Sequence, residues 1–474
     1  MTENTVPDRP NIIWIMADDL SWGDLGCLGQ QRIATPNIDR IAAEGMVFEQ
    51  CYSGSTVCAP SRSSPPRAQK AGHATVRNNS APGGYRHCLQ PDDTTVAEVL
   101  SEAGYRCGLF GKWGLAVHDQ TGLPNDKGFD EFCGYLNQRR AHNYYPEYLW
   151  RNTERIEFPQ HRGHDHKAPN QFDADGGIII NGVEDPAGAR YSFDVYADEA
   201  EVFLREPHEQ PFFLYLAYTI PHQALEVPEL GGYTDLDWPS IEHQIYAAMI
   251  TRMDAAIGRV LDLLDELGCA DDTLVFFTSD NGYSYAGWGE DLTFEEFFDH
   301  RGPWKGEKGN LHQGGLRVPT VARWPGRIEP GAASDLKWAF WDLMPTAAEV
   351  AGADLPCSTD GVSIAPTLLG RPERQQAREH LYWEYRDEQA VRLDDWYAFR
   401  PHPEQPVELY LALDDPQEQT NLAGDEPEVV ARVEEIMREE HEPNIYFPAP
   451  GQGVEEWQAA LKDADIELPE NIDV

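Results

Sequence analysis

The sequence is short of lysine, and its acidic residues far outnumber its basic ones. Eight of the 474 residues are lysine, and 37 Lys and Arg face 81 Asp and Glu, which leaves a formal net charge of −44. The negative electrostatic field of such a protein repels phosphate backbones and anionic membranes, so we expect neither a nucleic acid nor a membrane as a partner. The composition favours a protein adapted to high salt over an ordinary acidic protein. Salt ions reduce the distance over which the negative charges of such a protein repel one another.

Paired cysteines and long apolar runs are missing as well. The eight cysteines show no CxxC spacing, so we expect reduced thiols rather than a zinc ribbon or a disulfide framework. No stretch approaches the ~20 apolar residues of a membrane span. The first apolar run, Asn11 to Ala17, reaches Asp18 and Asp19 too soon for a secretion signal. A cytoplasmic protein is therefore expected.

The residues that are present indicate a folded α/β protein. Hydrophobic residues make up 41% of the chain, which is too many for a disordered polyanion. Apolar runs of strand length occur at 11–17, 104–110, 211–218 and 273–278, and helical patterns at 94–102, 197–205 and 244–267. Strands that alternate with helices predict a large, mostly parallel mixed sheet flanked by helices.

The last hundred residues predict a second, smaller unit. Short aromatic strands are expected at 380–386, 390–400 and 407–413, followed by a helix at 426–440. We therefore expect a catalytic domain over 1–370 and a C-terminal α+β domain over 371–474. The segment 154–188 is rich in Gly, His, Asp and Pro and shows no periodicity. It therefore predicts a long surface insertion near the entrance of the functional site.

Polar residues follow four of the predicted strands, where ligands of parallel sheets bind. These residues are Asp18-Asp19, Lys112, His222 and Asp280-Asn281. Three carboxylates and one amide carbonyl suit a hard divalent cation, Ca²⁺ in preference to Mg²⁺. Without a cation, the carboxylates are expected to repel one another and raise one another's pKa.

The string Cys58-Ala59-Pro60-Ser61-Arg62 could simply begin a helix, but it resembles a known signature. It is similar to the C-x-P-S-R motif of the type I sulfatases, formylglycine-dependent enzymes of the alkaline-phosphatase-like superfamily. Further motifs follow in that family's order, from PNIIWIMADDL and TPNIDRIAAEG through GKWGL, IPH and FTSDNG to KGNLHQGGLRVP and ELYLALDDPQEQTNLA. Together these motifs cover nearly the whole chain.

The resemblance implies a sulfuric ester hydrolase and a role for each motif residue. A maturation enzyme would convert Cys58 to formylglycine, whose hydrate would attack sulfur. Asp18, Asp19, Asp280 and Asn281 would hold calcium together with the modified Cys58. Arg62 would stabilise the hydrate, Lys112 and Lys308 would bind sulfate oxygens, and His222 would protonate the leaving alcohol. Lys305 is a weaker competitor of Lys308, and Asp24 fits a structural cap better than a further ligand.

Three departures from the family pattern stand out. The segment Ser63 to Gln69 contains Pro65-Pro66 where an apolar helix is usual, and proline beyond the first turn disfavours a helix. Gly114 stands where many members have histidine. The base that would help release sulfate from the sulfated hydrate and restore the aldehyde is therefore open between Asp280, a water and His118. Gln313 replaces a common glutamate, which we expect to be tolerated.

The substrate is the least constrained part of the prediction. Residues 138–150, QRRAHNYYPEYLW, combine arginine, histidine and aromatics in a way that suits sugar rings beside an anionic group, so carbohydrate sulfates are expected. A packed loop is an equal alternative. Two other functions stay open: a phosphomonoester or phosphonate hydrolase of the same superfamily, and a binder of sulfated ligands without turnover.

Overall fold

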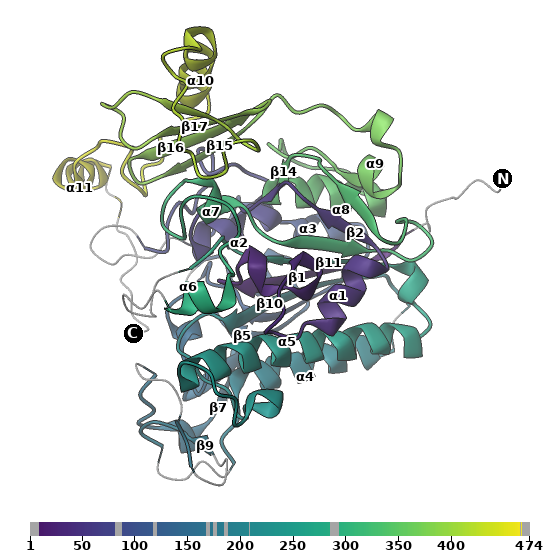
Figure 1. Cartoon of the computed structure of the whole chain (residues 1–474). Coiled ribbons are helices and arrows are strands. Elements are labelled where there is room, and N and C mark those ends of the chain that lie inside the picture. Colours follow the sequence, from purple (N-terminus) through teal and green to yellow (C-terminus); the bar gives the residue numbers. More distant parts are fainter. Residues whose placement is uncertain are drawn as a thin grey trace.

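The computed structural model describes residues 9–80, 88–116, 121–166, 171–173, 178–183, 188–207, 209–284, 293–464 and 466. Its centre is a mixed sheet of ten strands with helices on both faces (Figure 1). In spatial order the strands are β13 (Ala332–Ser334), β2 (Met46–Phe48), β12 (Thr320–Arg323), β11 (Thr273–Ser279), β1 (Asn11–Asp18), β10 (Phe212–Pro221), β4 (Arg106–Lys112), β5 (Glu131–Tyr135), β6 (Tyr148–Arg151) and β7 (Glu154–Glu157). The middle five strands, from β11 to β5, are parallel, and antiparallel pairs occur toward both edges, which confirms the predicted fold class.

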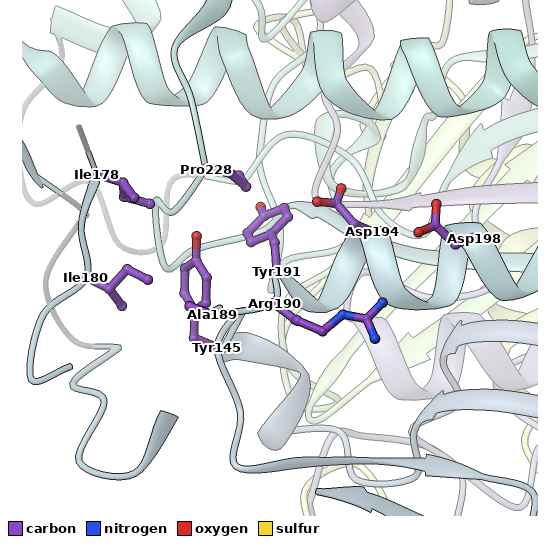
Figure 2. Close-up of a pocket in the computed structure, with 9 residues that line it drawn as sticks. All are labelled: Tyr145, Ile178, Ile180, Ala189, Arg190, Tyr191, Asp194, Asp198 and Pro228. Carbon is purple, nitrogen blue, oxygen red and sulfur yellow. The ribbon is translucent and has the colours of Figure 1, made fainter. Parts of the chain in front are cut away.

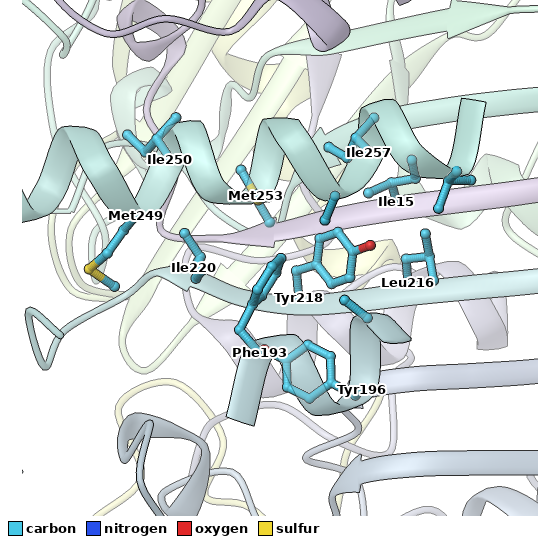
Figure 3. Packing of buried hydrophobic residues seen from close by; sticks show 14 of the residues in the cluster. Ile15, Phe193, Tyr196, Leu216, Tyr218, Ile220, Met249, Ile250, Met253 and Ile257 are labelled. Atoms are coloured by element: carbon cyan, nitrogen blue, oxygen red, sulfur yellow. The ribbon is translucent and has the colours of Figure 1, made fainter. Parts of the chain in front are cut away.

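Alternate side chains of β1 point to opposite faces of the sheet and enter two separate cores. Ile13 and Ile15 pack with α1 (Pro36–Ala43), α4 (Ser192–Arg205) and α5 (Ile241–Glu266). Figure 3 shows Ile15 and Leu216 beneath Ile257 of α5. Trp14 enters the core on the other face, with α2 (Cys58–Arg67), α3 (Val96–Glu102) and α8 (Leu343–Ala351). The central strands are therefore buried on both sides, which gives their ends fixed positions.

The C-terminal part forms its own antiparallel sheet. It consists of β15 (His380–Tyr385), β16 (Glu388–Leu393), β17 (Trp396–Arg400) and β18 (Glu408–Leu411), with α10 (Pro427–Glu439) and α11 (Val454–Asp463). Trp383 of this sheet packs against Tyr52 and Trp341 of the larger part, so the two share a core. The domain boundary at residue 370 stays a prediction.

The remaining elements are short. They comprise two-residue pairs, β3 (Cys51–Tyr52) with β14 (Trp338–Ala339) and β8 (Gln171–Phe172) with β9 (Ile178–Ile179), and the helices α6 (Thr293–Phe298), α7 (Gln313–Leu316) and α9 (Ala365–Leu368). The pair β8 and β9 and the edge strand β7 all lie within 154–188. The segment predicted as a surface insertion thus contains short strands that its sequence pattern did not indicate.

The largest differences from the predicted element boundaries occur at β16 and β17 and at the start of α4. The single strand expected at 390–400 is in fact the end of β16 and the whole of β17, because a turn at Asp394, whose φ is 45°, reverses the chain. Aromatic residues on both sides of this turn conceal it in the sequence. Helix α4 begins at Ser192, five residues before the expected start, since Phe193 and Val195 already belong to its buried face.

Two expectations about what the chain lacks can be compared with the structure. All eight cysteines are free thiols, and five of them are buried, which confirms the expectation of reduced cysteines. Within the described ranges, no helix combines the length and the apolar character needed to cross a membrane.

Candidate active site

Two parallel strand ends bring the expected metal ligands together. Asp18 ends β1, and Asp280 and Asn281 directly follow β11, its parallel neighbour. The backbone N–H of Asp19 donates to Oδ1 of Asp280 at 3.1 Å, and Nδ2 of Asn281 donates to Oδ1 of Asp19 at 2.8 Å. Asp19 itself has a φ of 64°, a left-handed turn that directs the chain away from the sheet. All four residues therefore form one buried group.

Each of the three carboxylates in this group has a cationic partner. The pairs are Lys112 Nζ with Asp18 Oδ2 at 2.6 Å, Lys308 Nζ with Asp19 Oδ1 at 2.6 Å, and Arg62 Nε with Asp280 Oδ2 at 2.9 Å. Five of the six residues are buried and the side chain of Lys308 is 11% exposed, so bulk water screens these charges little. The site thus contains balanced charge before any ion or substrate is added.

This balance overturns part of the electrostatic prediction. The expected mutual increase of the pKa is wrong for Asp18 and Asp19. Burial opposes the ionised form of Asp18, but Lys112 and the other cations outweigh burial and hold its pKa well below the usual value. Lys308 does the same for Asp19. Only the pKa of Asp280 rises, to about 6, because burial and the charge of Asp18 act in the same direction.

Cys58 lies at the centre of this charged group. It is the first residue of α2, and its Sγ lies 3.5 Å from Oδ1 of Asp18 and 3.2 Å from Nζ of Lys308. Complete burial raises the pKa of the thiol to about 12. A thiol protonated at neutral pH is a weak nucleophile, so ester chemistry here needs a different group at this position.

The unusual segment after Arg62 still forms a helix. Helix α2 continues through Pro65 and Pro66, both buried, and ends at Arg67. Ala68, with a φ of 52°, caps the helix through its N–H to the carbonyl of Ser64 at 2.8 Å. The two prolines therefore do not prevent the helix that begins at Cys58, although they lie beyond its first turn.

The donor set fits a metal ion. Asp18, Asp19, Cys58 and His222 each offer one ligand atom, and these four atoms lie within 4.8 Å of one another. The Oδ1 of Asn281 is buried and has no hydrogen-bond partner among the described residues. A buried carbonyl oxygen without a donor is costly, and a hard cation would satisfy it.

A pair of histidines completes the site. His222 follows β10, and its Nε2 lies 3.5 Å from Oδ2 of Asp19. Its Nδ1 contacts the carbonyl of Gln223 at 2.5 Å, and the Tyr144 hydroxyl donates to the carbonyl of His222 at 2.6 Å. His142 stacks on its ring. Sequence reasoning missed His142 as a site residue, because only its place in the segment 138–150 distinguished it.

Comparison with known proteins identifies the family. The model of the family described as Sulfatase matches residues 10–353 of the chain. The chain belongs to the sulfatase family. A second model, described as N-sulphoglucosamine sulphohydrolase, C-terminal, matches residues 303–442. Sulfatases hydrolyse sulfate esters, so this chain is an enzyme of that class.

The relatives of this sulfatase cover most of its length. Mouse (Mus musculus) steryl-sulfatase is 31% identical over 83% of this chain and 71% of its own, and human (Homo sapiens) N-acetylgalactosamine-6-sulfatase is 32% identical over 78% and 67%. A solved structure, Ps i-CgsB in complex with k-i-k-neocarrahexaose, superposes with a TM-score of 0.75 at 23% identity and covers 96% of this chain and 98% of its own. This last likeness shows the shared fold.

The weaker sequence candidates of this sulfatase lie elsewhere. Lys305 is outside the cluster, with its Nζ 5.8 Å above an aromatic ring of the C-terminal sheet. Asp24 accepts hydrogen bonds from the Ser21 N–H and the Tyr246 hydroxyl, both at 2.8 Å, which matches a structural cap. Gln313 is buried and donates to a backbone carbonyl at 2.9 Å. His118 lies outside the described residues.

The aromatic segment 138–150 of the sulfatase is packed rather than open. Tyr144, Tyr145, Tyr148 and Trp150 are all buried, and the guanidinium of Arg140 lies 3.9 Å above the Tyr148 ring. These rings are covered by protein and cannot stack on a sugar. The packed-loop alternative is therefore the one that the structure supports for this segment.

A cavity of about 300 Å³ lies beside this segment (Figure 2). It is lined by Tyr145, Ile178, Ile180, Ala189, Arg190, Tyr191, Asp194, Asp198 and Pro228. Its lining contains two carboxylates and one guanidinium, so the cavity carries no excess of positive charge for an anionic guest.

Proposed function

We propose that this sulfatase cleaves sulfate monoesters of carbohydrates, with a formylglycine made from Cys58 and a bound Ca²⁺. The position of Cys58 carries the proposal: a residue that is inert as a thiol lies within 3.5 Å of both a carboxylate and an ammonium group. Conversion of the thiol requires a formylglycine-generating maturation enzyme, which is therefore a proposed partner. Once formed, the hydrated formylglycine would supply the hydroxyl group that attacks sulfur.

The proposed calcium ligands are the oxygens that converge beside Cys58. Asp18, Asp19, Asp280 and the free Oδ1 of Asn281 would hold the ion, with an oxygen on the modified Cys58 as a further ligand. Bound there, Ca²⁺ would lower the pKa of a coordinated hydroxyl and thus make it a better nucleophile. An all-oxygen set with three carboxylates favours calcium over softer metals.

The three cations then bind and orient the substrate group. The ammonium group of Lys308 lies 3.2 Å from Sγ of Cys58, and that of Lys112 lies 2.6 Å from Asp18, whose other oxygen contacts the same Sγ; both would hold sulfate oxygens. The Nη1 of Arg62 is buried without a partner in the described part of the chain, and it would donate to the hydroxyl groups made from Cys58. Positive charge held in place before reaction stabilises the growing negative charge without reorganisation.

His222 would protonate the leaving alcohol. Its Nδ1 donates to the Gln223 carbonyl, so a second proton on the ring sits on Nε2, which faces the site beside Asp19. The Tyr144 hydroxyl holds the backbone of His222, and His142 supports its ring. We propose His142 as a positioning residue, because it acts on the substrate through His222.

Two observations support carbohydrates as the substrate class. A relative of this chain is named for an N-acetylgalactosamine sulfate, although another is named for a steryl sulfate. A solved structure of the same fold, Ps i-CgsB, is in complex with k-i-k-neocarrahexaose. The phosphoester alternative is not favoured, since the family itself is that of sulfatases.

A substrate panel tests this proposal. Sulfated N-acetylhexosamines, 4-nitrophenyl sulfate, a steryl sulfate and 4-nitrophenyl phosphate would be compared by kcat/KM with calcium present. We expect the sugar and aryl sulfates to be hydrolysed and the phosphate ester to be a far poorer substrate. A higher kcat/KM for the steryl sulfate than for every sugar sulfate would contradict the substrate class. Sulfate binding without turnover would support the alternative of a non-catalytic binder.

A further inference from the structure

Gln138 lies at the carboxyl end of β5, beside the strand that carries Lys112. Strands β4 and β5 are parallel, with Lys112 opposite Tyr135, and the Gly114 N–H donates to the Leu136 carbonyl at 3.2 Å. The segments that follow β4 and β5 thus remain hydrogen-bonded to each other past the end of the sheet. This pairing places Gln138 next to Gly114, two residues beyond a cation of the site.

The carboxamide of Gln138 is buried and unused. The residue is 1% exposed, and neither its Oε1 nor its Nε2 has a hydrogen-bond partner among the described residues. The adjacent Asn137 shows the contrast, since its Oδ1 accepts from the N–H groups of Arg139 and Arg140. A buried amide without partners destabilises the fold, and a ligand that pairs with it would remove this cost.

Gly114 provides the space that Gln138 occupies. A Cβ at position 114 would lie 2.6 Å from Oε1 of Gln138, closer than two such atoms can approach. Gly114 also has a φ of 74°, which disfavours any larger residue. Only one of the two positions can carry a side chain into this space, and in this chain it is Gln138.

We propose that Gln138 is a substrate-binding residue that donates from Nε2 to an oxygen of the sulfate group. This inference rests on the proposed function, because it assumes that the sulfate lies beside Lys112. Sulfate oxygens only accept hydrogen bonds, so the NH₂ end of the carboxamide is the group that fits them. The donor is neutral, so it binds the anion without adding to the balanced charges of Lys112 and Asp18.

The test replaces Gln138 by a side chain of similar length without polar atoms. Gln138→Met removes a donor but no satisfied hydrogen bond, so we expect kcat/KM for 4-nitrophenyl sulfate to fall by about 10-fold to 100-fold while Tm is unchanged or higher. Gln389→Met is the matched control. Gln389 is buried in the C-terminal sheet, and its amide donates to Tyr382 at 2.8 Å and accepts from Arg400 at 3.1 Å. This control should lower Tm and leave kcat/KM unchanged.

A binding measurement separates this proposal from the proposed function. Tm is measured in sodium sulfate and in sodium chloride of equal ionic strength, for the unchanged protein and for Gln138→Met. We expect a smaller sulfate-specific increase in the variant, even if neither protein hydrolyses the aryl ester. If sulfate raises the Tm of both proteins equally and their kcat/KM values are equal, the proposed role of Gln138 is overturned. A fall of Tm in Gln138→Met as large as that in Gln389→Met would do so as well, because it would show a structural role.

Discussion

The imidazole rings of His142 and His222 stack face to face, with their centroids 3.9 Å apart and an angle of 22° between their planes. Two adjacent positive charges in a buried site repel each other. Burial and the charge of His222 hold the pKa of His142 well below its usual value. Burial also lowers the pKa of His222, but Asp19 opposes this decrease. A proton on the pair is therefore expected on His222, the proposed acid.

The stack predicts a difference between two substitutions of His142. His142→Ala should lower kcat/KM about fivefold, because an aromatic pair of this kind contributes ~1 kcal/mol to the position of the second ring. His142→Phe should retain most of the activity, since it keeps a flat ring against His222. Steady-state kinetics on one aryl sulfate would compare them. Equal losses in both variants would instead mean that the ring nitrogens of His142 act directly.

The proposed acid predicts a dependence on the leaving group. His222→Ala should reduce kcat by about 10²-fold to 10⁴-fold for sugar sulfates, whose alcohols leave poorly, and far less for 4-nitrophenyl sulfate. A good leaving group departs as the anion and needs little protonation. Rates for a series of esters, plotted against the pKa of the leaving alcohol, would measure this. A uniform loss across the series would reject His222 as the acid.

The same residue predicts a pH profile. An acid works only while protonated, and burial lowers the pKa of His222 from its usual value of 6.5. For esters with poor leaving groups, kcat should thus be highest at acidic pH and should fall as pH rises through a value below 6.5. His222→Ala should remove this fall. A wild-type profile that is flat from pH 5 to pH 7 for such esters would exclude the assignment.

Modification of Cys58 is predicted in active protein. Mass analysis of the peptide that contains Cys58 should show an aldehyde, and Cys58→Ala should abolish turnover, because the buried thiol is protonated at neutral pH and inert. The modified fraction should scale with activity among preparations. Full activity in a preparation with only unmodified Cys58 would rule out the mechanism.

Metal removal and added salt are predicted to act separately. Chelation of Ca²⁺ should abolish turnover and lower Tm by a few degrees, since an ion bound only by the folded chain stabilises it. Asn281→Ala should raise the calcium concentration that restores activity. Molar KCl should raise the Tm of the calcium-loaded protein, because a net charge of −44 repels itself and salt screens it. A Tm that is constant in salt would reject high-salt adaptation and leave the metal site untouched.

The sequence by itself determined the order of the elements and the members of the central cluster. Apolar runs of strand length end at Asp18, Lys112, His222 and Asp280, and parallel strands in one sheet must place such ends along one edge. The motifs around Cys58 and Lys308 resemble those of sulfatases, so they predicted hydrolysis of sulfate esters. These features depend on local patterns, which a single sequence contains.

Only the tertiary structure decided how these groups pair. The distance between Lys112 and Asp18, and hence the lowered pKa of that carboxylate, depends on how β4 and β1 are arranged across β10. His142 meets His222 across 80 residues of chain, and Gln138 meets Gly114 between two strand ends. No periodicity or motif encodes such contacts, because packing between distant segments sets the positions of side chains to within an ångström.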